Sequence, residues 1–411
     1  MHSETTCRRE EFVLAVGPAS LLVGGLEVPA LGVGGAVPGP VLRPEEGSHV
    51  VVKVVATDGR LETVLETRRA LPGTYLYRAP APSEPGAPIA APYGLLVVTP
   101  RDPGHWPPVD AELFLVLDEL TPAHGRAAGA AGGVALVNGG SDWRAAVAAG
   151  EVVRLHLANA AHSRAFRLRL PGARLKLVGT GAGRVEREGL VDEVFLVPGD
   201  RAVVDALFER AGEHRLEHRL PGRSLPLAAF AVGPSGGGSA ARSAFEDLRA
   251  DPSLAGYRER LAAELERPPD ATVATSDVSA ARPRRLSAAG PLPKLRLLDP
   301  PTAGRPRQRL VSLEGGRLLV VSRDGVPVRS LAWADALLLR AGEVVDGLVE
   351  ATEGDVVAIR CRELETPQSH GTAVLHVGSR GRARVLRADE TAVPHGDEPD
   401  DPKDRRPHDA G

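Results

Sequence analysis

The sequence is poor in cysteine, nearly balanced in charge and free of long hydrophobic runs. Cysteine occurs only twice in 411 residues, at Cys7 and Cys361, which excludes a disulfide framework and a cysteine-based zinc cluster. The formal net charge is −3 at pH 7, which gives no general attraction to nucleic acid or anionic lipid. No uninterrupted apolar run approaches the length of a membrane-spanning helix. We therefore expect no nucleic-acid partner and no membrane span.

Glycine and proline, by contrast, are abundant. The chain holds 46 glycines and 36 prolines, which together make up about a fifth of it. Helix-rich proteins avoid so many helix-breaking residues, so many short strands joined by turns are favoured. Hydrophobic residues make up 43% and charged residues 25% of the chain, as in an ordinary folded protein. The length of the chain predicts about two or three domains.

An apolar stretch at residues 12–26 follows two arginines near the N-terminus and weakly resembles a signal peptide. Glu10 and Glu11 cancel the charge of the arginines, and Gly17 and Pro18 interrupt the apolar stretch. A removable signal has a positive start and a continuous apolar segment. We therefore expect a first β-strand here and a cytoplasmic protein; a periplasmic or extracellular location follows if the start of the chain is truncated.

β-branched and aliphatic runs bounded by glycine or proline recur along most of the chain, which is typical of β-strands. They fall into three blocks of similar length, which favours three β-sandwiches. A glycine- and serine-rich linker separates the last two blocks, and the acidic C-terminal segment is predicted to be disordered. The predicted divisions are a first domain at 1–105, a second at 106–234, a linker with a helix at 235–270, a third domain at 271–390 and a tail at 391–411.

One helix is predicted within the linker, from about Ser253 to Leu265. Its apolar residues are spaced three or four positions apart, as on one face of a helix. They are Leu254, Tyr257, Leu261 and Leu265. A pair of prolines follows and ends the helix.

Short motifs recur in a fixed order through the three blocks. In the first block, residues 72–77 (PGTYLY) and 93–98 (YGLLVV) resemble strands written GTYWYHSH and GLYGxLIV. In the second block, residues 150–160 (GEVVRLHLANA) resemble GExVRLRLxNA. In the third block, residues 331–335 (LAWAD) and 354–365 (GDVVAIRCRELE) lie where WKDT and GDWMYHCHILEH would stand. In this order and spacing, the motifs resemble those of the multicopper oxidase family over almost the whole chain.

The resemblance implies an all-β fold of three consecutive cupredoxin-like Greek-key β-sandwiches with one linker helix. The first domain is shortened, because the segment that would hold the family's first histidine pair has no counterpart. The linker also resembles a segment of some bacterial members. The family's activity depends on copper, which imidazoles and one thiolate hold. The family pattern would bring ten histidines and one cysteine.

Almost none of these ligands is present in this chain. The family's YHSH aligns with residues 77–80, its HPxHLHG with residues 309–315 and its HCHxxxH with residues 360–366. The degenerate ligand positions are therefore Arg78, Pro80, Arg309, Ser312, Glu314, Arg360, Cys361, Arg362 and Thr366. Of the family's ligands only the cysteine is retained.

Arginine cannot replace histidine as a metal ligand, because a guanidinium stays protonated and offers no lone pair. Four arginines also place positive charge where the family holds a cluster of cupric ions. We therefore expect no copper cofactor and no catalytic, cofactor-binding or metal-binding residues of the family type. No His-X-His sequence occurs anywhere in the chain.

Four histidines outside the aligned positions could meet a stray metal ion. His214 and His218 are predicted to lie on one strand, where four residues separate them by roughly 13 Å. His370 and His376 flank a turn and a strand of the third block. We interpret all four as structural histidines, and residual metal binding by them stays open.

The sequence favours a multicopper-oxidase-like protein that has lost its copper sites, a pseudoenzyme that serves as a non-catalytic binding or structural scaffold. Its expected partner is a protein that the sequence does not identify. The alternative is a copper-dependent, laccase-like oxidoreductase with atypical ligands. An unrelated activity carried by the loops also stays open.

Overall fold

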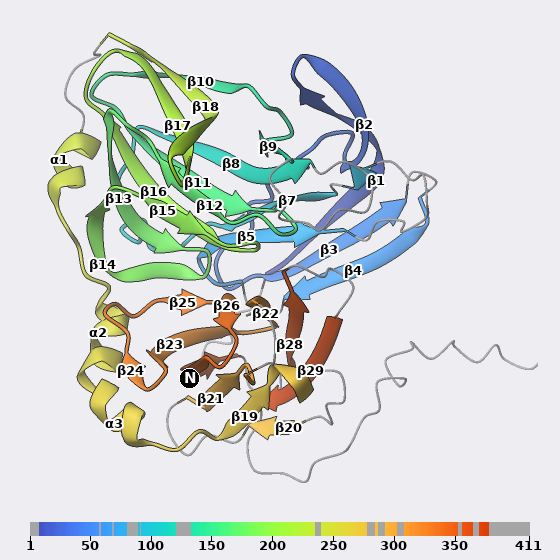
Figure 1. Cartoon of the computed structure of the whole chain (residues 1–411), viewed down its shortest axis with the longest axis vertical. Helices are drawn as coiled ribbons and strands as arrows, with labels where there is room; N and C mark the ends of the chain where they lie inside the picture. Colours follow the sequence, from blue (N-terminus) through green and yellow to red (C-terminus); the bar gives the residue numbers. More distant parts are fainter. Residues whose placement is uncertain are drawn as a thin grey trace, which may run out of the picture.

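The computed structural model is built mainly of β-strands, which form five larger sheets and one two-stranded sheet in the described part of the chain (Figure 1). The structure describes residues 8–56, 59–67, 70–79, 89–90, 92–120, 133–234, 240–277, 284–286, 292–301, 308–351, 356–364 and 370–377. The predicted C-terminal tail lies outside these residues. None of the described helices is long and apolar enough to cross a membrane.

The first block contains one five-stranded sheet, in the order β4-β3-β1-β2-β6, and the separate pair β5-β7. Its strands are β1 (Arg9–Val23), β2 (Leu26–Val33), β3 (His49–Ala56), β4 (Leu61–Thr67), β5 (Gly73–Arg78), β6 (Ile89–Ala90) and β7 (Tyr93–Val98). The apolar stretch near the N-terminus is strand β1, which pairs with β2 antiparallel and with β3 parallel. The expected first strand is therefore present.

The second block consists of two sheets, in the orders β14-β13-β16-β11-β8-β9 and β10-β18-β17-β12-β15. Its strands are β8 (Ala111–Leu120), β9 (Val134–Val137), β10 (Trp143–Ala148), β11 (Val152–Asn159), β12 (Phe166–Arg169), β13 (Ala173–Thr180), β14 (Gly183–Val191), β15 (Val194–Leu196), β16 (Arg201–Phe208), β17 (Gly212–Leu220) and β18 (Arg223–Gly233). Phe166, Phe208 and Phe230 are fully buried in one core built from both sheets. This is the arrangement of a β-sandwich.

The third block also has two sheets, in the orders β19-β21-β27-β23-β24, with β25 beside β23, and β20-β29-β28-β22-β26. Its strands are β19 (Ala271–Ala274), β20 (Arg284–Leu286), β21 (Lys294–Leu298), β22 (Gln308–Glu314), β23 (Arg317–Arg323), β24 (Val326–Pro327), β25 (Trp333–Ala334), β26 (Ala336–Arg340), β27 (Val344–Glu350), β28 (Val356–Glu363) and β29 (His370–Val377), and a 3-10 turn spans Thr275–Asp277. Leu318, Leu339 and Ile359 are buried in a core that both sheets share.

The linker contains three helices, so the prediction of one helix is wrong. They are α1 (Ala240–Glu246), α2 (Pro252–Glu259) and α3 (Leu261–Glu266). The predicted helix is broken at Arg260, whose backbone (φ −91°, ψ 0°) separates α2 from α3. Helix α1 has only two buried side chains, Ala241 and Phe245, so its short sequence carries little helical periodicity. Figure 1 shows the three helices in yellow along one side of the molecule, with α1 beside the second block and α2 and α3 beside the third.

Two fully buried lysines hold the ends of these helices. Lys176 on β13 donates from its Nζ to the carbonyl oxygens of Ala244 (3.1 Å) and Asp247 (3.2 Å), at the end of α1. Lys294 on β21 donates to the carbonyls of Glu264 (2.5 Å) and Arg267 (2.6 Å), at the end of α3. A cation is favourable there because the last carbonyls of a helix lack partners and carry partial negative charge.

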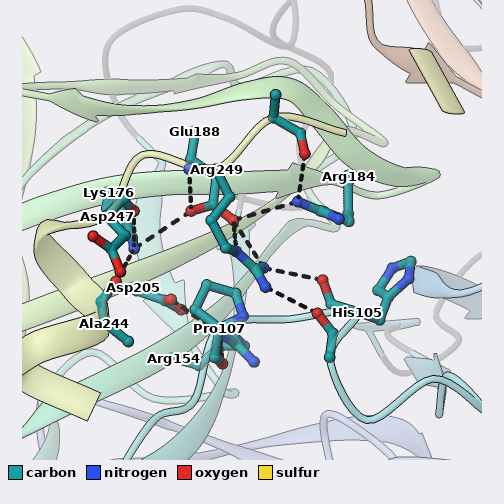
Figure 2. A network of polar contacts seen from close by, with 12 residues as sticks. His105, Pro107, Arg154, Lys176, Arg184, Glu188, Asp205, Ala244, Asp247 and Arg249 are labelled. Carbon is teal, nitrogen blue, oxygen red and sulfur yellow. Dashed lines mark hydrogen bonds and ion pairs between the residues drawn. The ribbon is translucent and has the colours of Figure 1, made fainter. Parts of the chain in front are cut away.

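The Lys176 contact belongs to a network of charges that fixes the linker to the second block (Figure 2). The buried carboxylate of Glu188 on β14 lies 3.5 Å from Lys176 Nζ and 2.9 Å from the Arg249 guanidinium. Arg249 also donates to the carbonyl oxygens of Gly104 (2.9 Å) and His105 (3.0 Å). Each of these charges therefore has a partner of opposite sign or a carbonyl, which is what burial of a charge requires.

All three blocks meet at the guanidinium of Arg201, at the start of β16. Its Nε donates to the carbonyl of Thr74 in the first block (2.9 Å), and its Nη2 lies 2.5 Å from both carboxylate oxygens of Asp335 in the third block. The turn at Gly181 fits closely around this side chain, since a Cβ there would lie 2.4 Å from Arg201 Nε.

Substituting Arg201 with leucine is predicted to lower the free energy of unfolding by about 3 kcal/mol, because it leaves buried acceptors of two other blocks without a donor. Urea unfolding followed by circular dichroism measures this change. The matched control is Arg144→Leu, which removes an ion pair whose arginine side chain is 67% exposed and should change stability by less than about 0.5 kcal/mol. Equal effects of the two substitutions would contradict this role of Arg201.

Candidate functional site

The positions where copper ligands would stand lie on strands β5, β22 and β28. They are Arg78 at the end of β5; Arg309, Ser312 and Glu314 on β22; and Arg360, Cys361 and Arg362 on β28. Pro80 and Thr366 lie outside the described residues. Strands β22 and β28 are antiparallel neighbours in which Ser312 pairs with Arg360. The fold thus brings the aligned positions of the third block onto two adjacent strands.

The retained cysteine is part of a hydrophobic core. Cys361 is 5% exposed and packs with Val311, Val357 and Ile359 between the two sheets of the third block. Burial raises the pKa of its thiol to about 11, an effect that the nearby Arg309 guanidinium only partly opposes. At neutral pH the side chain is therefore a protonated thiol, and binding of a metal there would have to release this proton.

Arg309, at the first aligned position of β22, is held by acidic and hydroxyl groups of its own block. Its Nε lies 3.3 Å from the Oδ1 of the buried Asp299, and its Nη2 lies 3.5 Å from Glu363 Oε1. Its Nη1 donates to Thr275 Oγ1 (3.1 Å). A metal cation placed at this position would be repelled by the guanidinium.

Two of the aligned positions form an ion pair with each other. Arg360 Nε lies 2.6 Å from Glu314 Oε1, and both side chains are more than half exposed. Their Cα positions are close because β22 and β28 are paired in the sheet. Where the family pattern has two imidazoles, this chain has a solvent-exposed cation and anion.

Arg78 and Arg362 come from different blocks and lie close together. Arg78 donates from Nη2 to the carbonyl oxygen of Ala160, and Arg362 donates from Nη1 to the carbonyl oxygen of His162 (2.8 Å). Burial lowers the pKa of Arg362 to about 10, and the positive charge of Arg78 adds to this shift. In the family pattern, the strands that align with β5 and β28 both hold ligands of one copper cluster. The alignment therefore predicts that Arg78 and Arg362 lie close together.

This set of side chains does not fit copper. Protonated guanidinium groups occupy four of the seven described positions and cannot donate a lone pair. The other three carry a serine, a carboxylate engaged by Arg360 and a protonated buried thiol. In the part of the chain that the structure describes, no group of three or more histidine, cysteine, aspartate or glutamate side chains could hold a metal ion.

The histidines considered as stray metal ligands are separated along their strands. His214 and His218 both lie on β17. The Nε2 of His214 lies 2.8 Å from the carbonyl oxygen of Arg210, and the Nδ1 of His218 accepts from the backbone N–H of Arg167 (3.1 Å). His370 and His376 lie at opposite ends of strand β29, roughly 20 Å apart at the usual rise per residue. The structure brings neither pair together.

A cleft of about 590 Å³ lies between the second and third blocks. Asp200 lines it, beside the ion pair of Arg201 and Asp335. Burial raises the pKa of the Asp200 carboxyl to about 7. The hydrogen bond that this carboxyl accepts from the Val197 backbone N–H (3.1 Å) favours the charged form and only partly opposes the shift. No histidine or cysteine is found among the described residues that line this cleft, so Asp200 has no such nucleophile beside it.

The arrangement of the three blocks is that of the multicopper oxidases, and the chain has their fold. The multicopper oxidase of Pseudomonas thermotolerans is 20% identical, with a TM-score of 0.65, and the match covers 91% of this chain and all of that one. The enzyme from Pediococcus acidilactici is 14% identical, with a TM-score of 0.67 and coverage of 92% and 90%. The metallo-oxidase from Campylobacter jejuni is 15% identical, with a TM-score of 0.62 and coverage of 92% and 93%. No protein-family description and no curated protein sequence matches the chain.

These similarities confirm the predicted all-β fold of three cupredoxin-like sandwiches. Sequence reasoning missed the interactions that join the blocks, above all the pair of Arg201 and Asp335. Arg201 ends the sequence PGDR at residues 198–201, and Asp335 ends the motif LAWAD at residues 331–335. The sequence does show opposite charges in segments of two different blocks. That pattern alone does not identify Arg201 and Asp335 as the pair in contact.

The Cys361 thiol is predicted to resist modification in the native protein. In a Cys7→Ser variant it is the sole thiol, and with a pKa of about 11 only about one molecule in a thousand is a thiolate at pH 8. A soluble aromatic disulfide reagent should release no product with the folded protein and one equivalent per chain in denaturant. Rapid native labelling would contradict the buried position.

Asp200 is predicted to make stability fall as pH rises. Because the folded state binds the Asp200 proton more tightly than the unfolded state, its contribution is present near pH 4 and is lost as pH rises to about 7 and above. Urea unfolding should therefore show Asp200→Asn gaining stability relative to the unsubstituted protein between pH 5 and pH 8. The control is Asp192→Asn at an exposed aspartate, and an identical pH trend for both variants would contradict the assignment.

Proposed function

We propose that this chain is a non-catalytic scaffold with the multicopper oxidase fold. The observation that carries the proposal is the state of the aligned ligand positions. Arg309 and Arg360 are paired with carboxylates, and Arg78 and Arg362 donate to backbone carbonyls. These side chains make the contacts of structural residues, and loss of a functional site outweighs similarity of fold in assigning an activity.

The scaffold is proposed to consist of three domains, at residues 1–105, 106–234 and 271–390, with the linker at 235–270. The sheets divide the strands in the same way, as β1–β7, β8–β18 and β19–β29. Apolar contacts join the blocks, since one cluster includes Tyr93 of the first block and Ala158 of the second. Such contacts would present the outer surfaces in a fixed relative position.

A protein is the proposed partner, and the outer face of the first sheet supports this. Val13 on β1 and Val64 on β4 are 62% and 43% exposed and flank Lys53 in register across the sheet. Leu61, on the same edge strand, is 56% exposed. Exposed apolar side chains mixed with charge are typical of protein contact surfaces.

The proposal predicts that the purified protein does not bind copper at the aligned positions. After incubation with excess cupric and cuprous ions and desalting, elemental mass spectrometry should find less than about 0.1 copper per chain, and no absorption band near 600 nm should appear.

The same measurement on Cys361→Ser distinguishes the alternative of a copper-dependent oxidoreductase. Copper near one per chain with a band near 600 nm, both lost in Cys361→Ser, would overturn the scaffold proposal and establish a thiolate–copper site. Trace copper that is equal in the two proteins is the result that the scaffold proposal predicts.

A further inference from the structure

Two arginines, one from the first block and one from the third, reach the same loop of the second block. Arg78 ends β5, and Arg362 lies on β28. Their guanidinium groups donate to carbonyl oxygens only two residues apart, those of Ala160 and His162. Three separate parts of the fold thus converge on two cations.

The loop that receives both arginines is held firmly in place. The Glu119 carboxylate accepts from the backbone N–H groups of Ser163 (2.9 Å) and Arg164 (3.0 Å) and also from the Ser163 hydroxyl (2.8 Å). The buried Asn159 side chain accepts from the N–H of Ala161 (2.9 Å) and donates to the carbonyl of Arg164 (2.8 Å). The carbonyls that orient the two guanidinium groups are therefore fixed before any ligand arrives.

Neither cation forms an ion pair with a carboxylate of the described residues. Within the described part of the chain, no carboxylate lies within 4.0 Å of either guanidinium group, although Asp118 attracts Arg78 from a greater distance and the Tyr93 ring lies 5.9 Å from it. Arg309 on β22 and Arg360 on β28 both have such carboxylates. Among the described residues, the lack of a carboxylate at ion-pair distance sets Arg78 and Arg362 apart.

Solvent reaches both side chains, since Arg78 is exposed and Arg362 is half-buried. Each guanidinium carries five N–H donors, and one donor of each is used by a loop carbonyl. The remaining donors of the two planar forks match the several acceptor oxygens of a phosphate group.

We propose that Arg78 and Arg362 form a binding site for a tetrahedral oxyanion, a phosphate group, at the junction of the three blocks. The anion would bring negative charge to both guanidinium groups and would connect the first and third blocks through them. The site goes beyond the scaffold proposal and does not depend on it, since it rests on the two arginines and their loop.

The test is thermal unfolding of the full chain with increasing inorganic phosphate, at pH 7.5 and constant ionic strength set with sodium chloride. A ligand that binds only the folded state raises Tm in a saturable way. The unsubstituted protein should show this rise, and Arg362→Gln should lose most of it. Arg360→Gln, which removes a neighbouring exposed arginine that already has a carboxylate partner, should keep it.

A parallel titration with sodium acetate tests the class of anion. Acetate should give a smaller rise in Tm, because a planar carboxylate presents fewer oxygens to two guanidinium forks. Equal responses of Arg362→Gln and the unsubstituted protein to phosphate would overturn the site. So would the absence of a saturable response, and an acetate response equal to that of phosphate would overturn the tetrahedral class. Copper loading is a separate measurement, so failure here leaves the scaffold proposal standing.

Discussion

The guanidinium of Arg201 is the interaction on which the assembly of the three β-sandwich blocks depends. It is the one group described above that bonds to all three, through Thr74, its own block and Asp335. An arginine suits this place because its planar fork reaches several acceptors at once and cannot lose its charge on burial. The tight turn at Gly181 and the buried Asp200 both lie against it. The relative positions of β5, β16 and β25, and hence of the two walls of the cleft, follow from this contact.

The same chemistry accounts for how the charges at the aligned ligand positions are balanced. Copper-binding imidazoles are neutral, whereas an arginine carries a permanent charge that neighbouring groups must compensate. Asp299 and Glu363 form ion pairs with Arg309, and Glu314 forms one with Arg360. Burial keeps the Cys361 thiol protonated. Only Arg78 and Arg362 depend on carbonyl oxygens rather than carboxylates, which is why an anion site is proposed for that pair.

Much of the fold follows from the sequence, because motif order and turn residues are local signals. The strands expected from residues 72–77, 93–98 and 150–160 are β5, β7 and β11. The linker helices were less predictable: α1 buries only two side chains, and the break at Arg260 lies inside a continuous apolar pattern. The partners of Arg360 and Arg201 depend on strand register and block packing, which no single segment encodes. The alignment of Arg78 and Arg362 with copper-ligand positions of the family does carry long-range information, because it predicts that two segments far apart in the sequence lie together.

The central claim is that arginine has replaced the copper-binding imidazoles and that the retained cysteine is a core residue. Anomalous diffraction at the copper absorption edge, from crystals soaked in cupric and in cuprous salts, tests it most directly. The account predicts no anomalous peak between β5, β22 and β28, where Arg78, Arg309, Arg360 and Arg362 lie, and none bonded to Cys361 Sγ. A peak at bonding distance from that sulfur would contradict the account.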